Sequence, residues 1–193
     1  MFLQYGADNR KNARCPHCGS LERDRLTFLI FKNVVNVFQE NVKLLHINPK
    51  YIFSDLFEKH SNIDHWPVEI NKKDKNSNYF DIEDMAYKNN SFDVVFLSHV
   101  LEYLPNDMRA LEEIYRVIKP AKTGAYVVIV SPIFKNLDKT EEREFNGQMK
   151  PVRSYGIDFS NRLKSIGFHV QKYDKFDLIE EKYLNMYGIF YNS

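Results

Sequence analysis

Residues 81–132 read DIEDMAYKNNSFDVVFLSHVLEYLPNDMRALEEIYRVIKPAKTGAYVVIVSP, and this stretch decides the fold. Its near-continuous apolar run, 92–97, predicts a strand that is covered on both faces. Apolar residues then recur every three or four positions over 108–118, which predicts a helix that Asp107 caps. A second apolar run, 126–130, predicts another strand. This strand–helix–strand order is typical of one half of an open parallel α/β sheet.

The flanking sequence predicts further elements of the same architecture. Helices are expected over 21–38, 51–59 and 156–166, and strands over 43–47, 65–70 and 79–82. Two late runs, 168–173 and 186–191, are expected to pair as an antiparallel edge. Residues 134–155 show no steady period and predict an inserted lid or substrate loop, because ordered loops of this length are uncommon unless they are functional.

Length and composition limit the class of protein. A chain of 193 residues with 44% hydrophobic content is enough for one α/β domain and too short for two ordinary ones, so we expect a single domain over 1–193, in which 1–40 forms an N-terminal segment and helix. The 27 basic and 26 acidic residues nearly cancel, which argues against a nucleic-acid partner.

We find no apolar run long enough to span a bilayer and no signal peptide, so we expect a cytoplasmic protein without a membrane partner. The sequence does not fix the oligomeric state.

The motifs in and around the central stretch carry a resemblance to a known family. The order Asp-Ile, S-F-D-V-V, H-V-L-E-Y-L-P and R-V-I-K-P within 81–120 resembles the class I S-adenosylmethionine-dependent methyltransferases of the broad type-11 group. Residues 2–26, FLQYGADNRKNARCPHCGSLERDRL, and 141–156, EEREFNGQMKPVRSYG, resemble a small subfamily with a CPxCGSLERxRL opening and a late GQxxxVRxYG segment. The resemblance covers nearly the whole chain. It implies a Rossmann-like sheet, mostly parallel with an antiparallel C-terminal edge strand, and S-adenosyl-L-methionine as cofactor.

The resemblance places the first cofactor contacts after the strand over 43–47. His46 stands where the general family has an acid, and Asn48 and Lys50 stand in place of its glycine-rich turn, although the small subfamily also carries a His-x-x-Pro turn. We expect Asn48 to cap the next helix with Pro49 in its first turn, so that the helix N–H groups and Lys50 bind the cofactor carboxylate. The alternative is a well-capped turn without a ligand.

Further cofactor contacts are expected at the next strand ends. Glu69, beside Ile70, would accept hydrogen bonds from both ribose hydroxyls. Asp81 and Ile82 match the family position that holds adenine, Asp81 through the amino group and Ile82 through its N–H and apolar surface. Ser98, at the exit of the central strand, completes the set. For either acid the alternative is a surface carboxylate, which is what most Glu and Asp residues are.

Polar residues at the exits of the two central strands are the candidates for chemistry. Ligands of open parallel sheets bind beyond the carboxyl ends of the strands, which directs attention to Ser98, His99 and Ser131. Methyl transfer needs positioning, and a base only where the nucleophile must lose a proton. The ordinary pKa of histidine suits His99 to that task, and Glu102 would orient His99 or contact substrate. A helix cap for His99 and a solvated helix position for Glu102 are the alternatives.

The late V-R-S-Y-G segment is expected to line the acceptor pocket. Arg153 would bind a carboxylate or phosphate of the acceptor, with Tyr155 beside it. The small subfamily has an acidic-His pair just before this segment, and Lys150-Pro151 replaces that pair here.

Cys15 and Cys18 are the only cysteines and stand in Cys-Pro-His-Cys. This spacing supplies two thiolates, whereas a structural zinc site needs four protein ligands. We therefore expect two reduced thiols and no bound metal. A zinc ion completed by His17, His46 or a second subunit is the alternative.

Two classes of function compete. The first is a methyltransferase that acts on oxygen or nitrogen of a small-molecule or glycan-precursor acceptor, since relatives of this kind often accompany surface-polysaccharide biosynthesis. The second is a non-catalytic partner or regulatory module with the same fold, motivated by the altered acceptor segment and by the absence of glycine between Gly19 and Gly124. The balanced charge disfavours a third, RNA methylation. Binding of S-adenosylhomocysteine separates the first two.

Overall fold

The structure is a computed structural model that describes residues 2–6, 9–70, 80–144 and 150–180. The chain divides into two compact units. One comprises 1–41, 51–62 and 171–193, and the other comprises 42–50 and 63–170. The second unit contains the main sheet and nearly all of the residues predicted to carry function.

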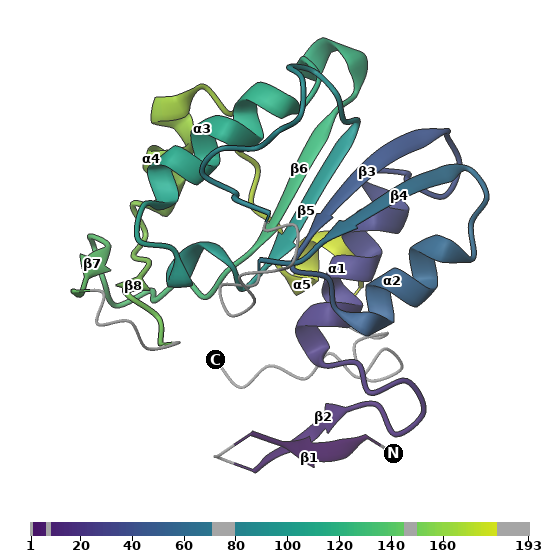
Figure 1. Cartoon of the computed structure of the whole chain (residues 1–193). Helices are drawn as coiled ribbons and strands as arrows, with labels where there is room; N and C mark the ends of the chain where they lie inside the picture. Colours follow the sequence, from purple (N-terminus) through teal and green to yellow (C-terminus); the bar gives the residue numbers. More distant parts are fainter. Residues whose placement is uncertain (1, 7–8, 71–79, 145–149, 181–193) are drawn as a thin grey trace. The chain divides into compact units, whose positions relative to one another are not determined.

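A four-stranded parallel sheet forms the framework of the second unit (Figure 1). Its strands are β3 (Val42–Ile47), β4 (Ile63–Val68), β5 (Val94–Ser98) and β6 (Tyr126–Val130), in the order β4-β3-β5-β6. Every neighbouring pair is parallel. The predicted Rossmann-like α/β architecture is therefore confirmed, and all four carboxyl ends lie at one edge of the sheet.

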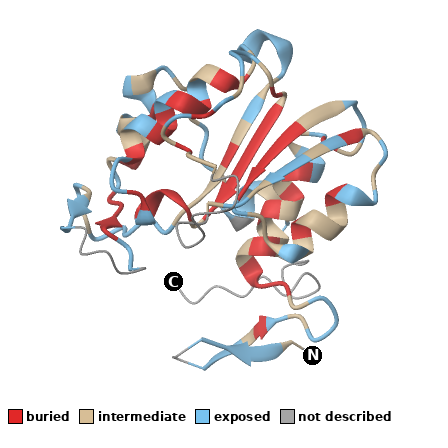
Figure 2. Cartoon of the chain, in the orientation of Figure 1, coloured by how far each residue is buried: buried red, intermediate tan, exposed pale blue. Residues whose placement is uncertain are grey.

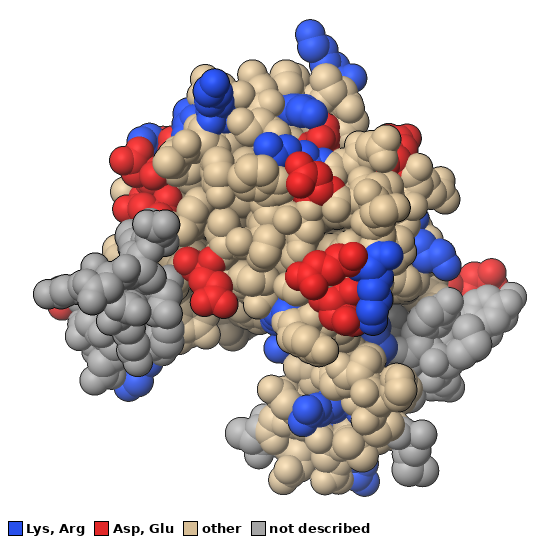
Figure 3. Space-filling view, turned by 45° about the vertical axis from the view of Figure 1, so that its right-hand side comes forward, with Lys and Arg blue, Asp and Glu red and all other residues tan. Residues whose placement is uncertain are grey.

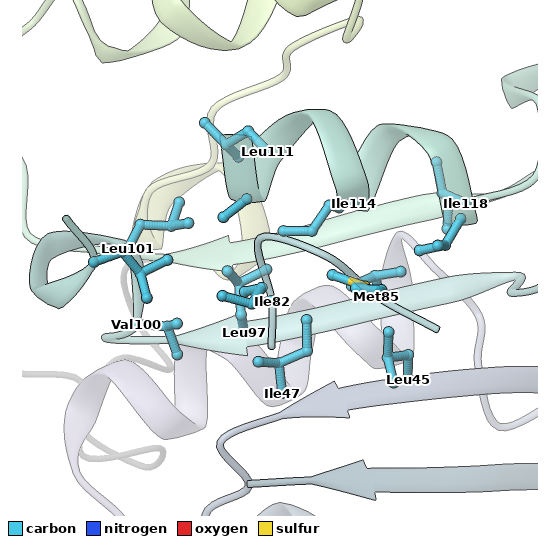
Figure 4. Close-up of a cluster of buried hydrophobic side chains, with 14 of the residues drawn as sticks. Leu45, Ile47, Ile82, Met85, Leu97, Val100, Leu101, Leu111, Ile114 and Ile118 are labelled. Carbon is cyan, nitrogen blue, oxygen red and sulfur yellow. The ribbon is translucent and has the colours of Figure 1, made fainter. Parts of the chain in front are cut away.

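The core of this unit lies between the sheet and α3 (Asp107–Val117) (Figures 2 and 4). All five residues of β5 are buried, as its unbroken apolar sequence predicts for an inner strand. Side chains alternate along a strand, so Val95 and Leu97 join the core beneath α3 while Phe96 faces the other way. From α3 the same core receives Leu111, Ile114 and Val117, which recur with helical spacing. Burying each such side chain contributes about 1.5–3 kcal/mol.

The start of α3 corrects one prediction. Asn106, not Asp107, is the N-cap, because its side-chain oxygen accepts the N–H of Arg109 at 3.1 Å. Asp107 is the first residue of the helix and is 1% exposed. Its carboxylate is engaged by groups far away in the sequence, which are described with the site below.

The remaining elements of the second unit are short. The 3₁₀ turns η1 (Leu101–Tyr103) and η2 (Ala121–Thr123) follow β5 and α3. Helix α4 (Phe159–Ile166) starts later than expected and ends at Gly167, whose φ of 119° suits glycine. Within 134–155 two antiparallel two-residue strands form, β7 (Glu141–Glu142) and β8 (Arg153–Ser154), and residues 145–149 lie outside the described residues.

Two strand predictions differ from the structure. Residues 80–82 form no strand, because the Asp81 carboxylate accepts the N–H of Glu83 at 2.8 Å and closes a turn there. Residues 168–173 are not in a strand either. Their expected partner, 186–191, lies outside the described residues, and β7–β8 is the antiparallel pair of this unit.

The first unit contains the two ends of the chain. Strands β1 (Leu3–Tyr5) and β2 (Arg10–Arg14) pair antiparallel, and the helices are α1 (Glu22–Asn33), α2 (Tyr51–Glu58) and α5 (Lys175–Leu178). The ring of Phe31 in α1 meets those of Phe53 and Phe57 in α2 edge-on, with centroids 5.9 and 5.2 Å apart. Helix α1 ends five residues before the predicted 38, and Asn36 beyond it takes a left-handed conformation with a φ of 53°.

Charged side chains of both signs are interspersed on the face shown in Figure 3. This distribution agrees with the nearly equal numbers of basic and acidic residues. Of the helices that the structure describes, none combines the length and the apolar character needed to cross a bilayer.

Candidate functional site

Polar residues gather at the carboxyl edge of the parallel sheet. Asn48 follows β3, Glu69 follows β4, His99 follows β5 and Ser131 follows β6. Backbone hydrogen bonds extend the strand pairing to this edge, since the N–H of Asn48 donates to Val68 O and that of His99 donates to Val130 O, both at 2.8 Å. The topology thus places these four residues at the edge where open parallel sheets generally bind their ligands.

His99 is held by a carboxylate and by an unusual backbone conformation. Its φ is 55°, in the left-handed region that is uncommon for residues other than glycine. Its Nδ1 lies 2.9 Å from Oε1 of Glu102, and Oε2 of Glu102 accepts the hydroxyl of Ser131 at 3.0 Å. The Glu102 side chain is 3% exposed. A carboxylate only accepts, so Nδ1 of His99 carries the proton and Nε2 presents its lone pair.

The Nε2 atom of His99 has no hydrogen-bond partner among the described residues. The atom is shielded from solvent, although the side chain as a whole is 29% exposed. Buried polar atoms nearly always have a partner, and those without one call for an explanation. A lone pair held in this way suits an imidazole that receives a proton from a bound ligand.

His46 is packed inside the second unit. It is 1% exposed, its ring stacks on Phe96 with centroids 4.7 Å apart, and its Nδ1 lies 3.2 Å from Nε2 of His65. Burial, with His65 and Lys50 adding to it, lowers the pKa of His46 to about 3. A neutral, packed histidine is a core residue, and the predicted cofactor contact of His46 is not supported.

The turn after β3 differs in detail from the prediction. Helix α2 begins at Tyr51, so Pro49 precedes the helix and Asn48 lies too early to cap it. Asn48 is exposed and has a φ of 53°, the conformation that glycine usually supplies. Lys50 is half-buried. The chain therefore makes a glycine-like turn without glycine.

The other predicted cofactor residues differ in how far protein contacts already engage them. Glu69 is exposed, directly follows β4 and makes no hydrogen bond or ion pair with any described residue. Asp81 is half-buried and already accepts the N–H of Glu83. The remaining three residues are packed or buried. Ile70 packs against the core, Ile82 is part of the core (Figure 4), and Ser98 is 5% exposed. Among the described residues, the carboxylate of Glu69 is thus a charged group that remains available for a ligand.

Arg153 and Tyr155 belong to an ion cluster that we define by Asp107, Glu142, Arg153, Tyr155 and Arg162, in which Asp107, Arg153 and Tyr155 are buried and Glu142 is exposed. Nη2 of Arg162 and the hydroxyl of Tyr155 each donate to the Asp107 carboxylate at 2.8 Å. Burial, followed by the charge of Asp107, raises the pKa of Tyr155 above its ordinary value. Tyr155 is fully buried.

The guanidinium of Arg153 has partners for all of its N–H groups. Nε lies 3.3 Å from Glu142, and Nη1 donates to the carbonyl oxygens of Leu101 and Leu104 at 3.4 and 3.1 Å. Nη2 lies 3.3 Å from Pro105 O and 3.4 Å from Oδ1 of Asp107. No donor remains for an acceptor, so the predicted acceptor contacts of Arg153 and Tyr155 are not supported. Arg153 thus ties β8 to residues 101–105, and Tyr155, directly after β8, binds the first residue of α3.

Several important contacts were absent from the prediction. Ser131 was expected at this edge, but its bond to Glu102 spans 29 residues of sequence, and only the order of the strands reveals it. His65 carries no sequence signal, because its approach to His46 depends on the pairing register of β3 and β4. Among the described residues, no three His, Cys, Asp or Glu side chains gather in a group that could hold a metal ion.

Comparisons with known proteins agree with this architecture. Residues 51–128 match a family model described as a methyltransferase domain. A solved S-adenosylmethionine-dependent methyltransferase from Mesorhizobium loti is similar at a TM-score of 0.52 and 11% identity, over 76% of this chain and 83% of that one. A SAM-dependent methyltransferase from Methanosarcina mazei is similar at 0.51 and 15%, over 71% of this chain and 84% of that one.

A third similar structure is named for a different reaction. The [4+2]-cyclase SpnF aligns at a TM-score of 0.53 and 17% identity, and the match covers 89% of this chain but 65% of that one. Likeness at such identities shows a shared fold, and one fold can serve several reactions. The chain therefore has the fold of the class I S-adenosylmethionine-dependent methyltransferases, and its residues 51–128 carry the sequence pattern of their methyltransferase domain.

Proposed function

We propose that the chain binds S-adenosyl-L-methionine at the carboxyl edge of its sheet and transfers the methyl group to oxygen or nitrogen of a small-molecule or glycan-precursor acceptor. The observation that carries the proposal is a pair of groups without a hydrogen-bond partner among the described residues: the exposed carboxylate of Glu69 and Nε2 of His99. They lie at the ends of the two strands that flank β3. The match of residues 51–128 to a methyltransferase domain supports it.

The residues at this edge fit such a cofactor. Glu69 would accept hydrogen bonds from the ribose hydroxyls, and its charge would attract a cationic ligand. The left-handed Asn48 would let the backbone turn close to a ligand, as glycine does in similar sites. The missing glycines, which motivated a non-catalytic role, therefore no longer argue against cofactor binding.

The residues around His99 would handle the acceptor proton. The bound cofactor supplies a methyl group that is already activated as a sulfonium. Glu102, itself fixed by Ser131, holds the His99 ring with Nε2 as the basic atom. Nε2 would take the proton of a hydroxyl or protonated amine as that nucleophile attacks, and Glu102 would stabilise the imidazolium that forms. The nearly equal numbers of basic and acidic residues support a small acceptor rather than a nucleic acid. The cytoplasm is the location that we propose.

Glu69→Ala is expected to weaken S-adenosylhomocysteine binding by about 2 kcal/mol, roughly 30-fold, because two charge-assisted hydrogen bonds are lost. Isothermal titration calorimetry measures the change. Asp64→Ala is the matched control, since Asp64 is an exposed carboxylate near the other end of the same strand. The affinity of this variant for S-adenosylhomocysteine should equal that of the wild type. An unchanged affinity in Glu69→Ala removes Glu69 from the site. A wild-type chain that does not bind would favour the non-catalytic module.

His99→Ala is expected to lower turnover by about 100-fold or more, the usual contribution of a positioned general base. The affinity for S-adenosylhomocysteine should stay near the wild-type value, because His99 acts on the acceptor proton. Release of S-adenosylhomocysteine in the presence of hydroxylated small molecules and glycan precursors is the assay. Glu102→Gln should keep the ring in place but reduce turnover and shift its pH profile. Full turnover in His99→Ala would leave positioning alone as the mechanism.

A further inference from the structure

The first unit presents two thiols that the proposed methyl transfer does not use. Cys15 and Cys18 lie in the loop that joins β2 to α1 (Figure 1). The loop is closed by two backbone bonds, Gly19 N to Cys15 O at 3.0 Å and Cys15 N to Ser20 O at 2.9 Å. Gly19 has a φ of 73°, which lets the chain reverse at this point. Across this loop the thiol of Cys18 forms a hydrogen bond with the sulfur of Cys15.

Hydrogen bonds favour a thiolate at Cys15. The backbone N–H of Cys18 is the main donor to its sulfur, and the N–H of His17 and the thiol of Cys18 also contribute, so that the pKa of Cys15 lies below its ordinary value although partial burial opposes this. Cys18 is exposed and Cys15 is half-buried, so both are within reach of a small reagent. Sγ of Cys18 also lies 3.2 Å from the hydroxyl of Ser20.

Arg25 fastens this loop and adds positive charge to it. Its Nη1 donates to Ser20 O at 2.6 Å, and its Nη2 donates to Ala13 O at 3.1 Å. The guanidinium thus ties the residues on both sides of the cysteine pair to α1. Its charge also favours the ionised form of Cys15 and so helps to lower the pKa of that thiol.

The surroundings favour disulfide chemistry over metal binding. Two thiolates are half of a structural zinc site, and the described residues offer no group of three ligands anywhere. A fixed guanidinium stabilises a thiolate but repels a metal cation. A disulfide, in contrast, needs only the two sulfur atoms.

We propose that Cys15 and Cys18 form a dithiol site for thiol–disulfide exchange with low-molecular-weight disulfides of the glutathione class. The Cys15 thiolate attacks one sulfur of the disulfide, a mixed disulfide forms, and one glutathione leaves as thiolate and takes a proton from solvent. Cys18 then releases its proton and attacks the Cys15 sulfur, which closes the Cys15–Cys18 bond and expels the second glutathione. Two protein thiols are oxidised and one glutathione disulfide is reduced to two thiols. The proposal does not depend on methyl transfer.

A redox titration of the whole chain tests the site. The protein is equilibrated in mixtures of reduced and oxidised glutathione, free thiols are alkylated, and the mass is measured. The wild type should pass from two alkylated thiols to none as oxidised glutathione increases, whereas Cys18→Ser should stop with one glutathionyl group on Cys15. Arg25→Gln should slow the reaction about threefold for each unit by which the pKa of Cys15 rises, because the loss of thiolate outweighs its greater nucleophilicity.

Two controls make the outcome decisive. Arg23→Gln removes a positive charge two residues away on the same helix and should react like the wild type. The double variant Cys15→Ser with Cys18→Ser should unfold at the wild-type temperature and take up no glutathione. The proposal is overturned if the wild type keeps two alkylatable thiols in oxidised glutathione, if Arg23→Gln slows the reaction as much as Arg25→Gln, or if the purified chain carries one zinc ion that protects both thiols.

Discussion

Asp107→Ala is expected to lower the free energy of unfolding by about 3–5 kcal/mol, the usual cost of removing one partner from a buried ion pair. The Asp107 side chain is 2% exposed and that of Arg153 is 4% exposed, so water cannot replace the lost carboxylate around Arg153. The variant also removes the acceptor of the Tyr155 hydroxyl, and it leaves Arg162 with Glu142 as an ion partner. Urea unfolding monitored by circular dichroism measures the loss.

Asp138→Ala is the control for this prediction, because Asp138 is exposed and has no ion pair with any described residue. It should change stability by less than about 0.5 kcal/mol. Adding Arg153→Met to Asp107→Ala should cost less than the two single losses combined, since both charges of a coupled pair then disappear together. A loss below about 1 kcal/mol in Asp107→Ala would mean that the cluster behaves as a surface ion pair.

Acid is expected to destabilise the protein through His46 by on the order of 3 kcal/mol between pH 7 and pH 4. The pKa of His46 is lowered to about 3 in the folded chain, whereas it is about 6.5 when the chain is unfolded. Between these values the unfolded chain binds the additional proton, so stability is complete above pH 6.5 and is lost as the pH falls toward 3. Burial is the main cause, and the nearby His65 and Lys50 oppose a further positive charge.

His46→Leu isolates this contribution. The difference in unfolding free energy between pH 7 and pH 4 should shrink by about the 3 kcal/mol that linkage assigns to His46. Glu113 loses its stabilising charge in acid in both proteins, because a hydrogen bond from Arg116 lowers its pKa, so that effect cancels in the comparison. His169→Gln, at an exposed histidine, should leave the pH dependence unchanged. An equal acid loss in His46→Leu and the wild type would show that His46 is not desolvated.

Local patterns predicted the framework of the sheet unit. The apolar run 126–130 is the observed β6, and the first, second and central strands lie within two residues of their predicted ends. The central strand β5 is buried along its whole length, as a continuous apolar run in an inner strand predicts, whereas β6 is only partly buried. The strand expected over 79–82 was wrong for its described residues, since the hydrogen bond from Asp81 to Glu83 competes with pairing. The single-domain organisation and the N-terminal subfamily stay predictions.

The sequence predicted those parts of the candidate site in which residues meet because of strand order or a short spacing in the chain. His99 and Glu102 lie three residues apart and do meet, as one of their predicted roles requires. Long-range contacts gave no local signal. The local sequence predicted that Asp107 caps a helix. Its actual partners, Tyr155 and Arg162, are 48 and 55 residues away in the sequence, so local patterns could not reveal them. Arg153 was predicted to bind an anion of the acceptor, but its guanidinium donates to carbonyl oxygens of residues 101–105, which are also distant in the sequence.

The glycine-like turn at Asn48 has a consequence for the denatured chain. Five of the six described non-glycine residues with positive φ are asparagines: Asn9, Asn12, Asn36, Asn48 and Asn90. Asparagine tolerates this conformation, yet it has fewer backbone states than glycine when the chain is unfolded. Each such choice lowers the conformational entropy of the denatured ensemble, an effect of about 0.4–1 kcal/mol where the native backbone accepts the side chain without strain. At positive φ this gain is opposed by the strain that a side chain meets in the left-handed region, so asparagine can take the place of glycine there with a small net change in stability.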